Sequence, residues 1–201
     1  MDDQVKPAQR IAGPAGFLLV LLVFLLLPGV AASCSVSESQ EGAGSLSANA
    51  NGADLVLGGD PYLEAEGAFE MPPTLHASIV EFAQPEEPVR FFASAAVVFM
   101  LLGMATMFVL VWRLRAVVIL VVTVVAAACL TVAEILVVQQ WVRQAEELGS
   151  SMVYLPDAQG KDIVGLAGDI VHPQYGFWLT LAGLLAIAAP NLFLLIRHRR
   201  R

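Results

Sequence analysis

The chain has 201 residues, of which 57% are hydrophobic and 14% charged, and its mean hydropathy is +0.71. These values lie outside the usual range of soluble globular domains, so lipid is the expected solvent for most of the chain. The net charge of −7 argues against nucleic acid as a partner.

Four apolar segments are each long enough to cross a bilayer as a helix, which takes about 20 residues. They comprise residues 13–33, 91–112, 116–138 and 175–196. Runs such as AVVILVVTVVAAACL have no polar face of the kind that a soluble helical bundle requires. We therefore expect an all-α membrane protein with four transmembrane helices and a small, partly irregular extracytoplasmic cap.

The basic residues predict the orientation. The N-terminal segment 1–12, the turn 113–115 and the tail 197–201 contain eight of the eleven Lys and Arg residues. The connections 34–90 and 139–174 contain fifteen acids. Because basic flanks stay in the cytoplasm, we expect both termini inside and both long connections outside.

The first outer connection is expected to form a compact cap on the helix ends. Its beginning is rich in Ser, Gly, Ala and Asn and is expected to be flexible. Residues 55–57 predict a short strand, followed by a turn at 58–61. Residues 74–84 predict a short amphipathic helix or strand on the membrane surface.

The second outer connection is expected to continue the third helix as far as Gly149, a natural C-terminal stop. Aromatic side chains favour the membrane interface. Trp141, Tyr175 and Trp178 are thus expected at the outer boundary, and Trp112 at the inner one.

Two cysteines raise the question of a disulfide. Cys34 lies at the outer end of the first segment and Cys129 well inside the third, so their depths differ and no disulfide is expected. Cys129 is interpreted as a small buried apolar residue.

Cys34 also ends the run LLPGVAASC, which resembles a bacterial lipoprotein signal because small residues directly precede the cysteine. In that interpretation residues 1–33 are removed and Cys34 carries lipid. No Leu stands three residues before the cysteine, and the segment is long enough to span. We therefore favour an uncleaved first helix.

Glu134 is the single charged residue within the four segments. An ionisable group inside a membrane helix is a functional hypothesis by default, although this one lies near the outer end. It shares a helix face with Thr123, Ala127 and Thr131, a pattern typical of helix–helix contacts in lipid. A structural or snorkelling role is favoured, and an ion or proton site is the alternative.

The fourth segment carries a stripe of small residues, Gly176, Thr180 and Gly183, which predicts a close contact with the third helix. Further along, Pro190 removes a helix hydrogen bond and Asn191 is suited to satisfy a freed carbonyl. A kink is expected there.

Motifs for catalysis, cofactors or metals are missing from the sequence. It has no HExxH, paired CxxC, P-loop, dinucleotide-binding glycine fingerprint or Gly-x-Ser-x-Gly motif. His76 and His172 both lie in outer connections, but two distant histidines are a weak metal signal. We predict no catalytic, cofactor-binding or metal-binding residues.

Three stretches carry a resemblance: FLLLPGVAASCS at the end of the first segment, GADLVLGGDP in the outer connection, and YGFWLTLAGLLA at the start of the last segment. With them the whole layout resembles a group of uncharacterised four-helix membrane proteins from actinobacteria and related bacteria. Members of that group often carry Trp after the proline, whereas Gly29 follows Pro28 here. The resemblance places the chain in the bacterial plasma membrane, but it does not imply any particular activity, so no catalytic residues are carried over from it.

The sequence therefore favours a non-enzymatic accessory or assembly component of the bacterial envelope. Its expected partners are the lipid bilayer and either other membrane proteins or further copies of itself. One alternative is a small transporter or ion-conducting protein that uses Glu134, and another is a lipoprotein lipidated at Cys34. An enzyme acting on lipid-linked substrates is a third.

Overall fold

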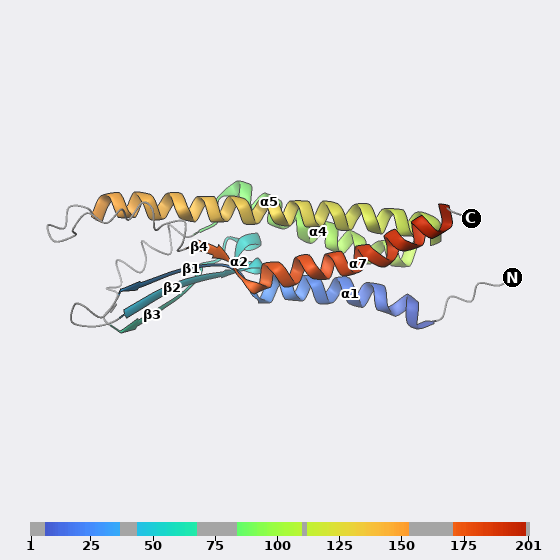
Figure 1. The fold of residues 1–201 in the computed structure, drawn as a ribbon, viewed down its shortest axis with the longest axis horizontal. Helices are drawn as coiled ribbons and strands as arrows, with labels where there is room; N and C mark the ends of the chain where they lie inside the picture. Colours follow the sequence, from blue (N-terminus) through green and yellow to red (C-terminus); the bar gives the residue numbers. More distant parts are fainter. Residues whose placement is uncertain (1–6, 37–43, 68–83, 110–111, 153–170, 200–201) are drawn as a thin grey trace.

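The computed structural model describes residues 7–36, 44–67, 84–109, 112–152 and 171–199, and the structural statements below concern these residues. The molecule is elongated, with its helices along the long axis and a β-sheet at one end (Figure 1). The helices are α1 (Pro7–Leu26), α2 (Gly52–Leu57), α4 (Glu87–Val109), α5 (Trp112–Met152) and α7 (Tyr175–Arg199). The strands are β1 (Pro28–Val36), β2 (Gly44–Asn51), β3 (Tyr62–Gly67) and β4 (Val171–Pro173).

Three helices are long and apolar enough to cross a membrane. The qualifying segments are Glu87–Thr106 in α4, Leu114–Gln144 in α5 and Tyr175–Arg197 in α7. The apolar part of α1, Pro14–Leu26, is shorter. A mostly helical membrane protein is therefore the class that the structure supports.

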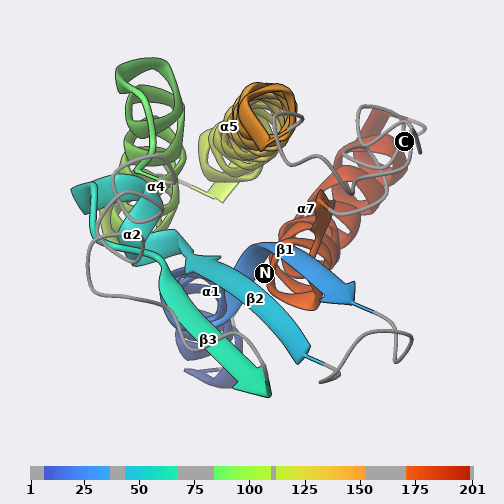
Figure 2. The same ribbon diagram turned by 90° about the vertical axis from the view of Figure 1, so that its left-hand side faces the viewer.

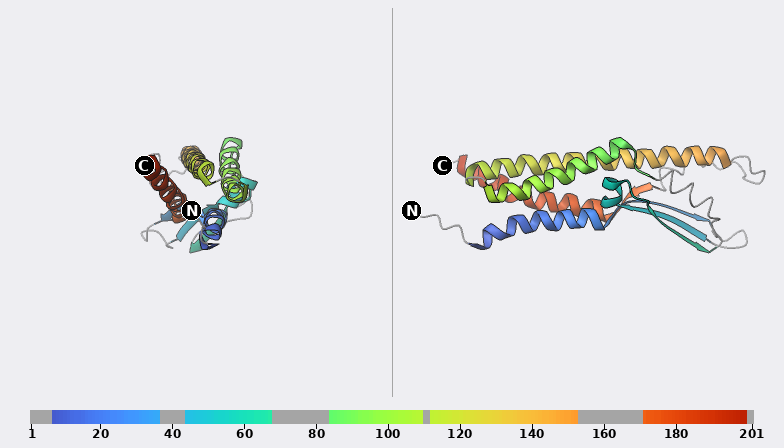
Figure 3. Two further views of the ribbon diagram at one scale, coloured as in Figure 1. Left: turned by 90° about the vertical axis from the view of Figure 1, so that its right-hand side faces the viewer. Right: turned by 180° about the vertical axis from the view of Figure 1, so that it is seen from behind.

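Four helices pack side by side in the order α1, α4, α5, α7 and back to α1. Figure 3 shows this arrangement in the view along the bundle, with α1 in blue and α7 in red. Glycines bring α1 close to its neighbours: a Cβ at Gly103 of α4 would lie 2.6 Å from the ring of Phe17, and one at Gly183 of α7 would lie 2.5 Å from Val20. Gly183 of the α7 stripe thus faces α1, and Gly176 lies against Leu27 and Pro28. The predicted contact between the third and fourth helices is also present, because α5 and α7 pack together, but these two glycines lie on the side of α7 that meets α1 and residues 27–28.

The first helix ends earlier than predicted. The backbone N–H of Leu27 makes the last helical hydrogen bond, to the carbonyl of Val23 at 3.1 Å. Pro28 then lacks an N–H and disfavours helical backbone in the residue before it. Residues 28–33, which were expected to complete a membrane helix, form the start of β1 instead.

At one end of the bundle lies an antiparallel sheet with the strand order β3-β2-β1-β4. Ala32 pairs with Ala48, and Leu46 pairs with Ala65, while the register shifts between Pro28 and Val30. Figure 2 shows the sheet from its outer end. The predicted flexible beginning was wrong for residues 44–51, which form β2; residues 37–43 lie outside the described chain.

Residues 52–57 form the short helix α2, which corrects the predicted strand at 55–57. The side chain of Asn51 accepts a hydrogen bond from the N–H of Asp54 at 3.0 Å, and the carboxylate of Asp54 accepts one from the N–H of Asn51 at 3.0 Å. This reciprocal capping box starts the helix. Gly58, with φ of +72°, ends it in the left-handed conformation, which agrees with the turn predicted at 58–61.

Helix α5 has 41 residues and is therefore about 60 Å long. It includes Arg113 and Arg115, so these residues are helical and not a separate turn. The predicted continuation beyond the membrane segment is confirmed, and the helix extends past Gly149 to Met152. Its outer part runs alongside the sheet (Figure 1).

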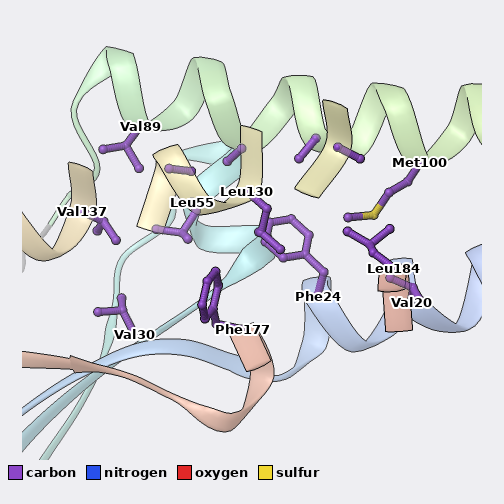
Figure 4. Packing of buried hydrophobic residues seen from close by; sticks show 14 of the residues in the cluster. Val20, Phe24, Val30, Leu55, Val89, Met100, Leu130, Val137, Phe177 and Leu184 are labelled. Carbon is purple, nitrogen blue, oxygen red and sulfur yellow. The ribbon is translucent and has the colours of Figure 1, made fainter. Parts of the chain in front are cut away.

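One hydrophobic core joins the helices to the sheet. Phe24 of α1, Leu55 of α2, Leu130 of α5 and Phe177 of α7 belong to a single cluster of buried residues, together with Val30 of β1. Figure 4 shows these side chains gathered where the strands leave the bundle. Among the described residues, the sheet therefore shares the core of the bundle.

Candidate functional site

Glu134 lies in α5 at the level where the bundle meets the sheet. Its side chain is only 5% exposed. Its Oε2 is 3.9 Å from the position that a Cβ on Gly29 would occupy, so the carboxylate lies beside the register shift at the start of β1. The carbonyl of Gly29 already accepts a hydrogen bond from the N–H of Gln174, at 2.6 Å.

The other carboxylate oxygen, Oε1, is buried and receives no hydrogen bond from any group in the described part of the chain. Most buried side-chain oxygens in proteins have a partner, because burying an unpaired charge or polar group costs free energy. Glu134 is therefore an exception that calls for a physical explanation.

A half-open groove of about 470 Å³ runs past this carboxylate between α5 and α7. Its walls are mainly apolar, and Glu134 is the one ionisable group among the described residues that line it. The rings of Phe177 and Trp178 meet edge to face with centroids 5.0 Å apart. The described lining comprises Thr131, Glu134, Ile135, Val138, Gln139, Pro173, Phe177, Trp178 and Leu181.

The predicted threonine face of α5 supplies few free polar groups. The hydroxyl of Thr123 donates to the carbonyl of Ile119 at 2.7 Å, and that of Thr131 donates to the carbonyl of Ala127 at 2.8 Å. Both hydroxyl protons are thus used within the helix. Thr123 and Glu134 are both buried, as expected for a face that packs against other helices.

Glu134 is the one titratable side chain among the described residues of the groove. One carboxylate in an apolar groove has no neighbouring base, nucleophile or second acid among the described lining residues. General acid–base or nucleophilic catalysis depends on such a partner within hydrogen-bond reach.

In comparisons with models of protein families, with curated proteins and with solved structures, nothing matches this chain. The resemblance to actinobacterial four-helix proteins stays a prediction. The roles of the residues thus rest on their chemistry and geometry.

The two cysteines lie in different elements. Cys34 is in β1, opposite Leu46, and its side chain lies outside the described set. Cys129 is a half-buried free thiol on α5. A cleavage before Cys34 would divide β1, which is one continuous strand from Pro28 to Val36.

The histidines are not brought together within the described residues. His172 is exposed on β4, and His76, like most of the predicted surface segment 74–84, lies outside the described chain. The described residues contain no group of three His, Cys, Asp or Glu side chains that could hold a metal ion.

The predicted boundary aromatics differ in environment. Tyr175 and Trp178 are exposed at the start of α7, as expected for residues at a membrane interface. Trp141 is only 5% exposed and belongs to the core, so its ring packs within the protein, and its place at the outer boundary stays a prediction. The side chain of Trp112 lies outside the described set.

At the predicted kink in α7, the side-chain amide of Asn191 donates to the carbonyl of Ile187 at 2.8 Å. Pro190 leaves the carbonyl of Ala186 without its usual helical donor. Asn191 therefore binds the carbonyl next to the freed one, four residues before itself.

Gln140 is a residue that the sequence interpretation missed. It is 2% exposed, donates from Nε2 to the carbonyl of Gln84 at 2.7 Å, and accepts at Oε1 from the N–H of Glu86 at 3.1 Å. This amide fixes the start of α4 against α5. A polar residue at the end of a long apolar run was the available signal.

A second recess of about 370 Å³ lies at the ends of α1 and β2 and the start of α7. It is more polar, and its described lining comprises Leu26, Pro28, Asn49, Asn51, Asp54, Tyr62, Gln174 and Tyr175. Its one acid, Asp54, belongs to the capping box of α2, so the charge there already has a structural partner.

Proposed function

We propose that the chain is a non-enzymatic accessory or assembly component of the bacterial envelope. In this proposal it is held in the plasma membrane by four helices, with α1 as the fourth span and both termini in the cytoplasm. The observation that carries the proposal is the single core shared by sheet and helices. A sheet that cannot move independently of its membrane anchor is suited to presenting a fixed surface to a partner.

The distribution of basic residues supports the proposed orientation, and the exposed aromatic residues support a membrane interface at the sheet end of the bundle. Arg115 and Arg197 lie at the ends of α5 and α7 that are far from the sheet (Figure 1). Exposed aromatic side chains lie at the sheet end of the bundle: Tyr62, Phe91, Tyr175 and Trp178. Basic residues inside and an aromatic belt at the interface are the usual pattern of a multi-pass protein.

The outer edge of the sheet is the surface that we propose for partner binding. Within the described chain β3 pairs with β2 alone, so its other side has backbone groups available for pairing. Tyr62 is 66% exposed on this strand, and Glu64 is also exposed. Addition of a strand to such an edge is a common mode of recognition.

Site-specific photo-crosslinking in cells tests this proposal. A photo-reactive amino acid at Glu64 is expected to give one discrete protein adduct, and the same protein is expected to co-purify in fixed stoichiometry after mild detergent extraction. The matched control position is Leu179, which is 52% exposed on the apolar surface of α7. Recovery of a lone monomer, with no adduct from position 64, would contradict the proposal.

The two main alternatives have less support. A transporter that uses Glu134 needs a series of polar groups across the membrane, but the hydroxyl protons of Thr123 and Thr131 are used within their own helix. A lipoprotein lipidated at Cys34 loses α1, whose residues Phe17 and Phe24 are almost completely buried in the core.

A further inference from the structure

The groove beside Glu134 has a feature that partner binding at the sheet does not use. Glu134 is one of the residues that line its mainly apolar walls, and Oε1 of this side chain is buried without a donor in the described chain. Removing a carboxylate from water is costly unless a cation or a hydrogen-bond donor compensates. A ligand that brings a cationic donor to Glu134 would compensate the burial of this carboxylate.

We propose that the groove binds an amphiphilic primary amine. The ammonium group donates a hydrogen bond to the carboxylate of Glu134, and the apolar chain lies along Phe177, Trp178 and Leu181.

The properties of the groove select this class of ligand. Its volume of about 470 Å³ is in the range of small-molecule sites. A carboxylate or phosphate head would be repelled by Glu134, and a plain hydrocarbon would leave the carboxylate without a donor. An ammonium group has three donors and a positive charge, and its hydrogen bonds to carboxylates are among the stronger ones in proteins.

The residues that line the groove also fit the apolar chain of the amine. Trp178 is 57% exposed at the rim, where its ring can attract a cation on its way to the carboxylate. Ile135 is also exposed, so the groove opens on the apolar surface of the bundle and admits a ligand from the bilayer. The position beside Gly29 puts the charged head at the level where the sheet begins.

Two sources can supply a primary ammonium on an apolar chain: a diffusible long-chain amine, or a membrane lipid with an amine headgroup. The shared chemistry is the ammonium group in contact with Glu134. The experiment therefore has one arm for each source.

The binding assay uses the full chain in a neutral maltoside detergent and the quenching of tryptophan fluorescence by brominated ligands. The probes are a brominated dodecylamine and the matching brominated alcohol and carboxylic acid. The amine is expected to bind at least about tenfold more tightly than the alcohol, because its bond to Glu134 is charge-assisted. Trp178→Phe is expected to remove most of the quenching, since Trp178 lines the groove.

Glu134→Gln is expected to weaken amine binding at least about tenfold and to change alcohol binding less than about twofold. The matched control is Glu87→Gln, which removes the same charge from an exposed site in the first turn of α4 and is expected to leave binding unchanged. Leu181→Trp, which fills the groove and keeps the charge, is expected to weaken both ligands. This variant keeps the test decisive if Glu134→Gln does not fold.

The second arm uses nanodiscs. Displacement of the brominated amine by phosphatidylethanolamine, but not by phosphatidylcholine, identifies a membrane lipid as the source. Amine binding without displacement identifies a diffusible amine. Equal amine binding by wild type and Glu134→Gln would overturn the proposal, as would an equal loss in Glu87→Gln or no amine binding at all.

Discussion

Gly176→Ala tests whether α7 packs against the junction of α1 and β1. A Cβ at this position would overlap the carbonyl oxygen of Pro28 and stand 3.0 Å from both the carbonyl carbon and the Cβ of Leu27. Because most of these atoms are backbone, rotation of a side chain cannot relieve the overlap. Overpacking of this kind costs about 1–3 kcal/mol, and we expect the upper half of that range.

Gly16→Ala is the matched control. It lies in α1, and a Cβ there would be 3.7 Å from Ile187, an ordinary contact. Replacing glycine inside a helix by alanine favours folding by up to about 1 kcal/mol. The two substitutions thus add the same methyl group and have opposite expected effects.

Thermal unfolding in detergent, followed by circular dichroism, compares the two variants. Soluble domains of this size change their midpoint by about 2–4 °C for each kcal/mol. We expect Gly176→Ala to unfold on the order of 5–10 °C below wild type and Gly16→Ala at or slightly above it. Equal midpoints for the two variants would refute the packing of α7 on residues 27–28.

Three further predictions follow from other contacts. Gln140→Leu is expected to lower the free energy of unfolding, measured by chemical denaturation, by about 1–3 kcal/mol, because it leaves backbone groups at the start of α4 unpaired. The control is Gln139→Leu at the exposed neighbouring position, which is expected to change this free energy by less than about 0.5 kcal/mol. Asn51→Ala is expected to cost about 1 kcal/mol and to speed amide hydrogen exchange in α2; unchanged exchange would argue against the capping box. In a background without the native cysteines, an impermeant maleimide added to intact cells is expected to label Glu64→Cys but not Arg197→Cys, and the reverse would invert the proposed orientation.

The three longest helices could be predicted from the length of the apolar segments in the sequence. The segments 91–112, 116–138 and 175–196 each fall largely within one of the helices α4, α5 and α7, because a long run without polar residues leaves a helix few alternatives in lipid. The end of the first helix was misplaced because hydrophobicity continues through Val30 to Ala32. The proline at position 28 was the stronger signal, since it removes a backbone donor and restricts the residue before it.

The sheet could not be predicted from alternation of apolar and polar residues. Its two longest strands consist largely of Ala, Ser, Gly and Asn, which have little intrinsic preference for strands. Their pairing depends instead on contacts with the bundle, such as the burial of Val30 and Ala50 in the shared core. For α2 the local signal was present: Asn51 and Asp54 have capping-box spacing, and Gly58 follows the helix.

The sequence pointed to Glu134 as a candidate residue but did not predict the groove beside it. Glu134 is prominent as a lone charge in an apolar helix, and its position near the outer end agrees with its place beside Gly29. The groove needs α7, whose Phe177 and Trp178 lie more than 40 residues away in the sequence. Only the packing of α5 on α7 brings these residues together.

The central claim is that α1 is a permanent part of the bundle, because Phe17, Val20 and Phe24 fill the core that the helices and the sheet share. Intact mass spectrometry of the protein purified from its native membrane tests this most directly. We predict an unlipidated chain near 21.4 kDa, allowing for processing of the initiating methionine. A shorter chain that begins at a lipid-modified Cys34 would contradict the account.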